Sequence, residues 1–415
     1  RFVGFDKTNE NLYWIWGENS SLGNLITAPF NDFSKRRASC GKLTPKINKS
    51  LSLQDQTILA VSEYYHKPEF VVINKTIAKD LGYLKRLRPE GSLQIISLTR
   101  DMQTWLITYL SSEKPFEVFI YHRANQTAEL LLNLNPELAG YPLSKQIGFD
   151  FSARDGLAIQ AYLSLPPEVP LKNPQKVPKK DFKIAVKGMI PMKPQKMVLL
   201  VHGGPQSRDD YGFDKMNAFL TSRGYAVLQV NYRGSTGFGK NLTNAGDGEW
   251  SRKMHTDLLD AVNFVVAKGI ANRSEVAIMG ISYGGYATLV GLTFTPDFFA
   301  CGVDVVGPTN LVTLMEQVPP YWNDIQNIYA KPLMIMQGAN DPRVKEQEAE
   351  QFVSALKNHS IPFTYVLYPD EGHGFRRAPN NLAMFGFMDK FLHDCLGGEY
   401  QPFTRGQYNE SAVVS

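Results

Sequence analysis

The sequence predicts a doubly wound α/β domain that carries a nucleophile elbow and follows an all-β domain. Two observations carry this prediction. Over residues 146–397 apolar strands alternate with helical patterns, which is typical of a mainly parallel sheet with helices on both faces. Over residues 1–145 short strand-like runs are broken by Asn, Asp, Gly and Pro. The polar residues 398–415 form a C-terminal tail, which we expect to be loose.

The N-terminal domain is expected to be an incomplete β-propeller, with a sandwich as the alternative. Its last four strand-like runs follow one another at near-regular spacing over about forty residues, the size of one propeller blade. Residues 1–145 therefore make about three blades, and an incomplete propeller leaves strand edges exposed. The runs are Leu12–Gly17, Leu22–Ala28, Ile58–Ser62, Phe70–Ile73, Leu93–Thr99, Thr104–Leu110, Glu117–His122 and Glu129–Leu132.

The α/β domain begins with a hairpin turning at Asp155-Gly156, followed by a Lys/Pro-rich surface loop around a short strand over 166–196. The expected buried strands are Met197–Val201, Ala226–Val230, Val276–Met279, Gly302–Val306, Pro332–Gln337 and Thr364–Leu367. The expected helices are Asp214–Arg223, His255–Lys268, Tyr286–Thr293, Glu346–Asn358 and Asn381–Leu396.

Composition is that of a globular chain of 415 residues, with 43% hydrophobic residues and a net charge of +4. There is no basic stripe interleaved with aromatic residues and no apolar run of about 18 to 20 residues. We therefore expect neither a nucleic-acid nor a membrane partner, while a homo-oligomer stays open.

The three cysteines, Cys40, Cys301 and Cys395, are widely spaced and match no zinc pattern, so we expect buried free thiols and no metal. We expect a cytoplasmic location. Eight N-x-S/T sequons leave a secreted or lysosomal location open. They lie at Asn19, Asn48, Asn74, Asn125, Asn241, Asn272, Asn358 and Asn409.

The strongest motif is Gly280-Ile-Ser-Tyr-Gly-Gly285, which lies between an apolar strand and a helical pattern. Glycines two residues on either side of Ser282 let the strand and the helix approach closely. Such a turn holds the serine in a strained conformation and exposes its hydroxyl, as in the G-x-S-x-G nucleophile elbow. Ser282 is therefore the expected nucleophile.

A serine hydroxyl needs a general base that a third group orients. His359 and His393 fall in helical patterns, whereas His373 lies in a Gly-flanked loop directly after the strand Thr364–Leu367. Because an open α/β sheet places its chemistry at the carboxyl ends of its strands, His373 is the expected base.

The expected acid is Asp341, which directly follows another buried strand and precedes His373 by 32 residues. Its role is to fix the tautomer of the histidine and to stabilise the imidazolium. Asp304 lies within a strand-like run and is expected to be structural, and Asp370 to be a turn residue.

Two backbone donors are expected to form an oxyanion hole. One is the N–H of Tyr283, and the other comes from His202-Gly-Gly-Pro205, with Gly204 preferred and Gly203 as the alternative. His202 itself is expected to pack within its loop. Arg233 is a candidate for binding a substrate carbonyl or carboxylate, with a loop-ordering role as the alternative.

Together these motifs resemble the prolyl oligopeptidase family of serine peptidases, with acylaminoacyl-peptidase-like members the most similar. The resemblance covers nearly all of 147–396, although the interval from Val306 to Pro332 is shorter than in the family. The matching motifs are His202-Gly-Gly-Pro, Asn231-Tyr-Arg-Gly-Ser-Thr-Gly-Phe-Gly239, Gly246-Asp-Gly-Glu-Trp250, Gly280-Ile-Ser-Tyr-Gly-Gly285, Gly338-Ala-Asn-Asp-Pro-Arg-Val344 and Glu371-Gly-His-Gly-Phe375.

The resemblance implies an α/β-hydrolase domain capped by a β-propeller, and hydrolysis of short or acylated peptides through an acyl-enzyme without metal or cofactor. A carboxylesterase of the same fold is the first alternative, because the triad alone does not separate amides from esters. The second is a catalytically impaired protein that binds partners through the propeller.

Overall fold

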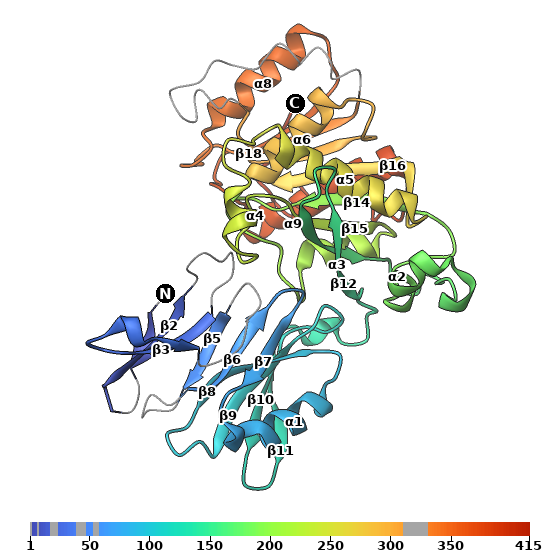
Figure 1. The fold of residues 1–415 in the computed structure, drawn as a ribbon. Coiled ribbons are helices and arrows are strands. Elements are labelled where there is room, and N and C mark those ends of the chain that lie inside the picture. The colour runs from blue at the N-terminus through green and yellow to red at the C-terminus, as the bar shows by residue number, and fades with distance from the viewer. Residues whose placement is uncertain (1, 6–7, 17–23, 39–46, 53–57, 310–330) are drawn as a thin grey trace. The chain divides into compact units, whose positions relative to one another are not determined.

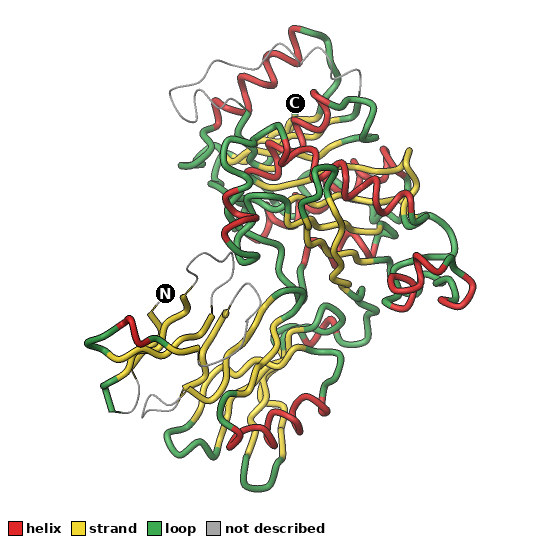
Figure 2. The backbone as a smooth tube through the Cα atoms, in the orientation of Figure 1, coloured by secondary structure: helices red, strands yellow, loops and turns green. Residues whose placement is uncertain are grey.

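The computed structural model describes residues 2–5, 8–16, 24–38, 47–52, 58–309 and 331–415 (Figure 1). Tertiary contacts divide the chain into two compact units. The first comprises Arg1–Gly148, Asp210–Asp214 and Ser235–Ala245, and the second comprises Phe149–Asp209, Lys215–Gly234 and Gly246–Ser415. Strands dominate the first unit, whereas helices and strands alternate in the second (Figure 2).

Three antiparallel sheets make up most of the described first unit, as expected for a partial propeller. They run in the orders β1-β2-β3-β4, β5-β6-β7 and β11-β10-β9-β8. The strands are β1 (Phe2–Phe5), β2 (Asn11–Trp16), β3 (Asn24–Pro29), β4 (Arg37–Ala38), β5 (Ile47–Ser52), β6 (Ile58–Tyr64), β7 (Pro68–Val72), β8 (Ser92–Leu98), β9 (Thr104–Leu110), β10 (Glu117–His122) and β11 (Thr127–Asn133).

The edge strand β11 exposes the leucines that the sequence places in it. Leu130, Leu131 and Leu132 keep 56%, 55% and 47% of their surface accessible. Three neighbouring exposed leucines on an edge strand are unusual, because such an edge can pair with another chain.

Helix α1 (Ala78–Leu87) was not predicted, because the strand-like runs on either side dominate the pattern. It buries Leu81 and Leu84 in the core cluster around Trp105. The carboxylate of Asp80, almost fully buried, accepts hydrogen bonds from Tyr121 Oη at 2.8 Å and from Arg123 Nε at 3.0 Å. The other helices among the described residues of this unit are α4 (Lys240–Asn244) and the short 3₁₀ helices η1 (Phe33–Lys35), η2 (Lys75–Ile77) and η3 (Pro136–Leu138).

A nine-stranded sheet organises the second unit, in the order β12-β13-β15-β14-β16-β17-β18-β19-β20. The strands from β15 to β19 are parallel, and the two edges are antiparallel. The predicted α/β-hydrolase architecture is therefore confirmed. The strands are β12 (Gln146–Ser152), β13 (Ala158–Ser164), β14 (Gln195–Val201), β15 (Ala226–Asn231), β16 (Ala271–Ile281), β17 (Gly302–Val305), β18 (Leu333–Gly338), β19 (Thr364–Tyr368) and β20 (Val413–Val414).

All five helices predicted for this unit are present. The Lys/Pro-rich loop contains a short helix, α2, where a short strand was expected. The helices in the described part of this unit are α2 (Phe182–Val186), α3 (Lys215–Ser222), α5 (Lys253–Ala267), α6 (Tyr283–Phe294), α8 (Glu346–Asn358) and α9 (Ala378–Leu396), with the 3₁₀ helices η4 (Pro174–Lys176) and η5 (Lys179–Asp181).

The C-terminal tail is ordered against the sheet, so the expectation of a loose tail is wrong. Strand β20 pairs antiparallel with β19, and Tyr365 exchanges two backbone hydrogen bonds with Ser415. Ala412 is buried in the core cluster. A strand of two residues leaves no periodic pattern in the sequence. The polar composition of residues 398–415 therefore gave the wrong prediction of a loose tail.

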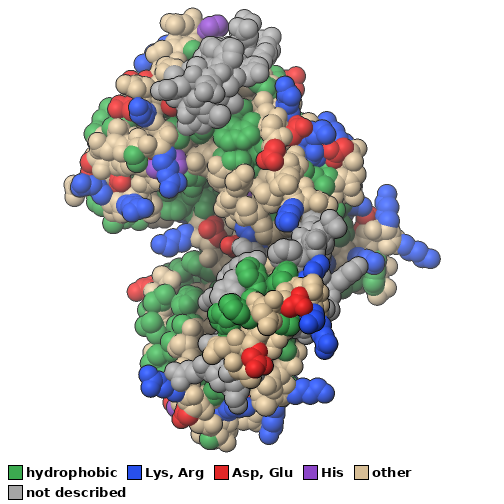
Figure 3. Space-filling view, turned by 60° about the vertical axis from the view of Figure 1, so that its left-hand side comes forward, with side chains coloured by type: hydrophobic (Ala, Val, Ile, Leu, Met, Phe, Trp, Pro, Cys, Tyr) green, Lys and Arg blue, Asp and Glu red, His purple; other side chains and the backbone are tan. Residues whose placement is uncertain are grey.

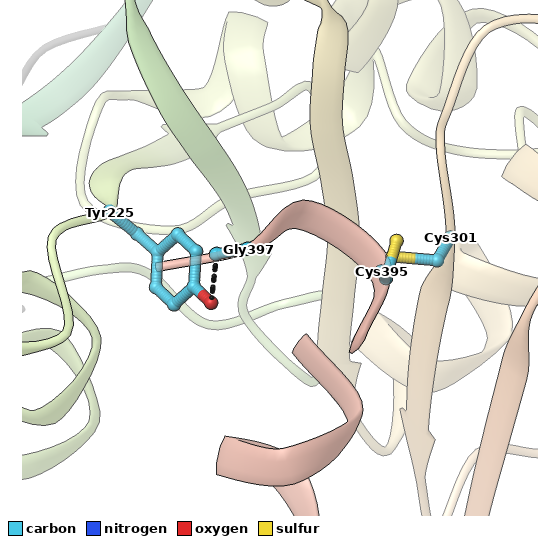
Figure 4. Close-up of a disulfide and its surroundings, with 4 residues drawn as sticks. All are labelled: Tyr225, Cys301, Cys395 and Gly397. Atoms are coloured by element: carbon cyan, nitrogen blue, oxygen red, sulfur yellow. Dashed lines mark hydrogen bonds between the residues drawn. A yellow bond between two sulfur atoms is a disulfide. The ribbon is translucent and has the colours of Figure 1, made fainter. Parts of the chain in front are cut away.

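A disulfide joins Cys301, the residue before β17, to Cys395 near the end of α9 (Figure 4). The expectation of free thiols is therefore wrong for this pair, and Cys40 lies outside the described residues. Close by, Tyr225 Oη donates a hydrogen bond of 2.7 Å to the Gly397 carbonyl oxygen. Both contacts attach the end of α9 to the sheet.

Removing this disulfide should destabilise the second unit substantially. It closes a loop of 94 residues that contains Asp341 and His373. Chain-entropy reasoning gives such a loop about 4 to 5 kcal/mol of stabilisation. We expect the Cys301→Ala/Cys395→Ala variant to lose about 2 to 5 kcal/mol in urea unfolding. A reductant should lower wild-type stability and leave the double variant unaffected; equal stability of both proteins without reductant would contradict the pairing.

Charged side chains of both signs are interspersed over the face seen in Figure 3. Within the described ranges, no helix combines the length and the apolar character needed to cross a bilayer. The same ranges contain no cluster of three or more His, Cys, Asp or Glu side chains arranged to hold a metal ion.

Candidate active site

The nucleophile elbow forms where β16 ends and α6 begins. Ser282 takes φ 59° and ψ −120°, a conformation that costs a non-glycine residue about 1 to 3 kcal/mol. A Cβ on Gly280 would overlap the backbone of Gly284, and a Cβ on Gly284 would overlap the Val201 carbonyl oxygen. Only glycine fits these two positions, so strand and helix hold the serine in place from both sides.

The structure brings the three predicted triad residues into one chain of hydrogen bonds. His373 Nε2 lies 3.0 Å from Ser282 Oγ, and His373 Nδ1 lies 2.7 Å from Asp341 Oδ2. The side chain of Asp341 is fully buried, while that of His373 keeps 14% of its surface accessible. The three residues follow β16, β18 and β19, so all lie at the carboxyl edge of the parallel sheet.

The backbone fixes which oxygen of Asp341 faces the histidine. Asp341 Oδ1 accepts hydrogen bonds from the N–H groups of Arg343 at 2.8 Å and Val344 at 2.9 Å. Oδ2 is therefore the oxygen left for His373 Nδ1. A carboxylate held by two N–H donors keeps its orientation, as the partner of a catalytic imidazole must.

Sequence reasoning missed the role of Glu371, although it lies in the predicted base loop. Its carboxylate is almost fully buried and accepts hydrogen bonds from the N–H groups of Arg376 and Arg377 at 3.0 and 2.9 Å. Asn380 Nδ2 donates a third, at 2.9 Å. Glu371 thus ties the chain that follows His373 to the start of α9. The sequence signal for this role was the acidic residue two positions before His373. A turn exposed to solvent would not need an acidic residue at that position.

The two candidate oxyanion glycines lie in different surroundings. A Cβ on Gly203 would lie 3.0 Å from the Ile281 carbonyl oxygen and 3.4 Å from Ser282 Cβ. The nearest neighbours of such a Cβ on Gly204 belong to the backbone and side chain of the following turn. Gly203, the alternative, is therefore the glycine that packs against the elbow. Tyr283 is the first residue of α6, where helix N–H groups lack intrahelical acceptors.

His202 packs within its loop, as expected. Its ring stacks on Tyr232 with a centroid distance of 4.4 Å, and its Nδ1 lies 2.8 Å from the Gly203 carbonyl oxygen. Tyr232 Oη donates to the His202 carbonyl oxygen at 2.8 Å. Burial lowers the pKa of His202 to about 4, so the ring is neutral near pH 7.

Acid should destabilise the second unit through its buried histidines. Burial also lowers the pKa of His255 to about 4. A histidine whose pKa falls on folding contributes stability above its unfolded pKa of about 6.5 and loses it as the pH falls through the folded value. The contribution of His255 to the free energy of unfolding should therefore fall by about 2 to 3 kcal/mol between pH 7 and 4.5.

Urea unfolding at the two pH values tests this with His255→Gln. Between the two pH values, the free energy of unfolding should fall by about 2 to 3 kcal/mol less in the variant than in the wild type. His359→Gln, at the exposed end of α8, serves as the control and should lose as much as the wild type. An acid loss unchanged in His255→Gln would contradict the prediction.

The environment of Arg233 does not support the expectation that it binds a substrate. Its side chain is only 3% exposed, and its guanidinium pairs with Asp257 and Asp155. Nε and Nη2 donate to Asp257, and Nη1 and Nη2 donate to Asp155, at 2.7 to 3.0 Å. These donors are turned to carboxylates within the protein, so the alternative of a loop-ordering role fits this environment.

The histidines and aspartates that were not assigned to the triad make other contacts in the structure. His359 Nδ1 contacts the Ala355 carbonyl oxygen, and His393 Nδ1 contacts that of Gly398. Asp370 accepts a hydrogen bond from Asn380 Nδ2 and pairs with Arg377. Asp304 is buried within β17, as the expectation of a structural residue requires.

Comparison with known proteins identifies the family of the chain. Residues 211–328 and 316–399 match the model of the prolyl oligopeptidase family. The chain is 54% identical to dipeptidyl peptidase family member 6 of Caenorhabditis elegans, over 99% of this chain and 60% of that protein. It is 44% identical to dipeptidyl aminopeptidase BIII of Pseudoxanthomonas mexicana, over 86% of this chain and 54% of that protein. The chain thus spans only part of these relatives' length.

Solved structures support the fold. A Mycobacterium tuberculosis puromycin-hydrolyzing peptidase superposes with a TM-score of 0.73 at 22% identity, over 97% of this chain and 62% of the other. The acylaminoacyl peptidase of Pyrococcus horikoshii superposes with a TM-score of 0.66 at 16% identity, over 98% of this chain and 65% of the other. The family match, the two relatives and the elbow geometry agree, and the chain belongs to the prolyl oligopeptidase family.

Proposed function

We propose that this chain is a serine peptidase that cleaves short peptides through an acyl-enzyme and prefers to release dipeptides from free N-termini. The observation that carries the peptidase proposal is the uninterrupted chain of hydrogen bonds from Ser282 through His373 to Asp341. The dipeptidyl preference is supported by the names of the two relatives that are 54% and 44% identical over most of this chain.

In the proposed reaction, Ser282 Oγ attacks the scissile carbonyl carbon while His373 Nε2 takes the hydroxyl proton. The carbonyl oxygen becomes an oxyanion, which the backbone N–H of Tyr283 and one from the Gly203-Gly204 segment would stabilise. The C–N bond then breaks as His373 returns the proton to the leaving amine. Water hydrolyses the acyl-enzyme by the same proton path and regenerates Ser282. Asp341 remains ionised throughout and stabilises the imidazolium.

The substrate class is tested by kcat/KM on four substrates. These are a dipeptidyl aminocoumarin amide with a free amine, its N-acetylated form, an N-acetyl-amino-acid amide and p-nitrophenyl butyrate. We expect the free dipeptidyl amide to be the best substrate, with Ser282→Ala as the blank. Turnover of the ester alone would overturn the peptidase proposal in favour of an esterase. A preference for the N-acetyl-amino-acid amide would instead assign the acylaminoacyl specificity.

A further inference from the structure

We propose that the buried carboxyl group of Asp304 is a positioning residue for Ser282, because it holds the turn after β17 to which the Ser282 backbone is hydrogen-bonded. The inference rests on the proposed function, and no role in the chemistry itself is assigned to Asp304. The mechanism above leaves this carboxyl group unused, although it lies close behind the elbow.

Asp304 lies at the centre of the sheet and against the first turn of α6. Its register partners are Gly280 in β16 and Ile335 in β18, and only 1% of its surface is accessible. A Cβ on Gly285 or on Gly307 would overlap Asp304 Oδ1. The carboxyl group is thus enclosed between the helix that follows Ser282 and the turn that follows β17.

A short path of contacts leads from Asp304 to the nucleophile. The Ser282 N–H donates to the Val305 carbonyl oxygen at 2.9 Å. The next residue, Val306, has a φ of +48°, which is unfavourable for a β-branched side chain. The Gly307 N–H closes this turn by donating to Asp304 Oδ1 at 2.9 Å. Asp304 therefore holds a strained residue next to the carbonyl group that fixes the backbone of Ser282.

Only one oxygen of this carboxyl group is used for the turn. Asp304 Oδ2 is buried and has no hydrogen-bond partner among the described residues. Burial raises the pKa of Asp304 to about 7, although the Gly307 N–H acts in the opposite direction. A neutral side chain of the same shape should therefore serve as well, since the turn needs an acceptor at Oδ1 and not a charge.

The test compares Asp304→Asn, Asp304→Ala and Val303→Ala. Asn keeps the acceptor, Ala removes it, and Val303→Ala shortens an equally buried side chain of the same strand that makes no contact in this path. Kcat and KM on the dipeptidyl amide, the rate of labelling by a fluorophosphonate, and Tm are measured for each. If Asp304→Ala does not fold, Asp304→Leu takes its place, since its side chain has about the shape of Asp but offers no hydrogen-bond acceptor to the Gly307 N–H.

Misplacing a nucleophile by about 1 Å can cost on the order of 100-fold in rate. We expect Asp304→Ala to lose about 10- to 100-fold in kcat and labelling rate with little change in KM. Asp304→Asn should stay within about threefold of the wild type, and Val303→Ala should lower Tm while keeping kcat.

Loss of kcat in Val303→Ala equal to that in Asp304→Ala would overturn the positioning role, because a general loss of stability would explain both. An inactive Asp304→Asn would overturn the acceptor role. An active wild type with an equally active Asp304→Ala would overturn this inference alone. A wild type that neither turns over the peptide nor labels would overturn the proposed function, and this inference with it.

Discussion

Replacing Ser282 by Ala should lower kcat for the dipeptidyl amide by on the order of 10⁶-fold, because the reaction then loses its nucleophile and the base has no proton to accept. The fold should survive. The serine Oγ contributes one hydrogen bond, to His373, while the backbone of the elbow is fixed by the close approach of Gly280 and Gly284. Alanine adopts the strained backbone at a cost similar to that of serine.

The measurement is steady-state kinetics with Tm determined on the same samples. Ser360→Ala is a matched control, since Ser360 also has a positive φ, of 55°, but lies on an exposed turn after α8. It should retain wild-type kcat. A Ser282→Ala variant that keeps more than about a thousandth of wild-type kcat would place the nucleophile elsewhere.

Replacing Asp341 by Asn should lower kcat by on the order of 10⁴-fold, although the shape of the side chain is kept. The reason lies in the two N–H groups of Arg343 and Val344, which donate to Oδ1. In the variant the amide oxygen must stay with these donors, so the NH₂ group faces His373 Nδ1. The histidine then accepts at Nδ1 and carries its proton at Nε2, where it cannot take the proton of Ser282.

Asp370→Asn is the control for this prediction, because Asp370 lies in the loop that carries His373 but contacts Asn380 and Arg377 instead of the histidine. It should keep kcat within about tenfold of the wild type, against on the order of 10⁴-fold for Asp341→Asn. The reverse result, a greater loss in Asp370→Asn than in Asp341→Asn, would assign the acid to Asp370.

The residues of the triad could be predicted because each follows a strand whose pattern is clear. The parallel strands β16, β18 and β19 are buried and apolar, so their carboxyl ends, and the polar residues just beyond them, could be located along the chain. Since such ends meet at one edge of the sheet, Ser282, Asp341 and His373 had to lie near one another. The elbow glycines Gly280 and Gly284 identified Ser282 independently.

Features that depend on distant partners could not be predicted in this way. Cys301 and Cys395 are 94 residues apart, and only the packing of α9 against the sheet brings their sulfur atoms together. The carboxylates that pair with Arg233 come from the β12–β13 hairpin and from α5. Nothing in the sequence around Arg233 indicates these partners. Strand β20 is formed by pairing with β19, since its own two residues have no periodicity.

The central claim is that Ser282 is a nucleophile activated by His373. The most direct measurement is mass spectrometry of the chain after incubation with a fluorophosphonate probe, with the adduct mapped to a peptide. We predict a single adduct on Ser282 in the wild type, none in Ser282→Ala, and labelling slowed by several orders of magnitude in a folded His373→Ala variant. An adduct on another residue, or equal labelling of the wild type and His373→Ala, would contradict the account.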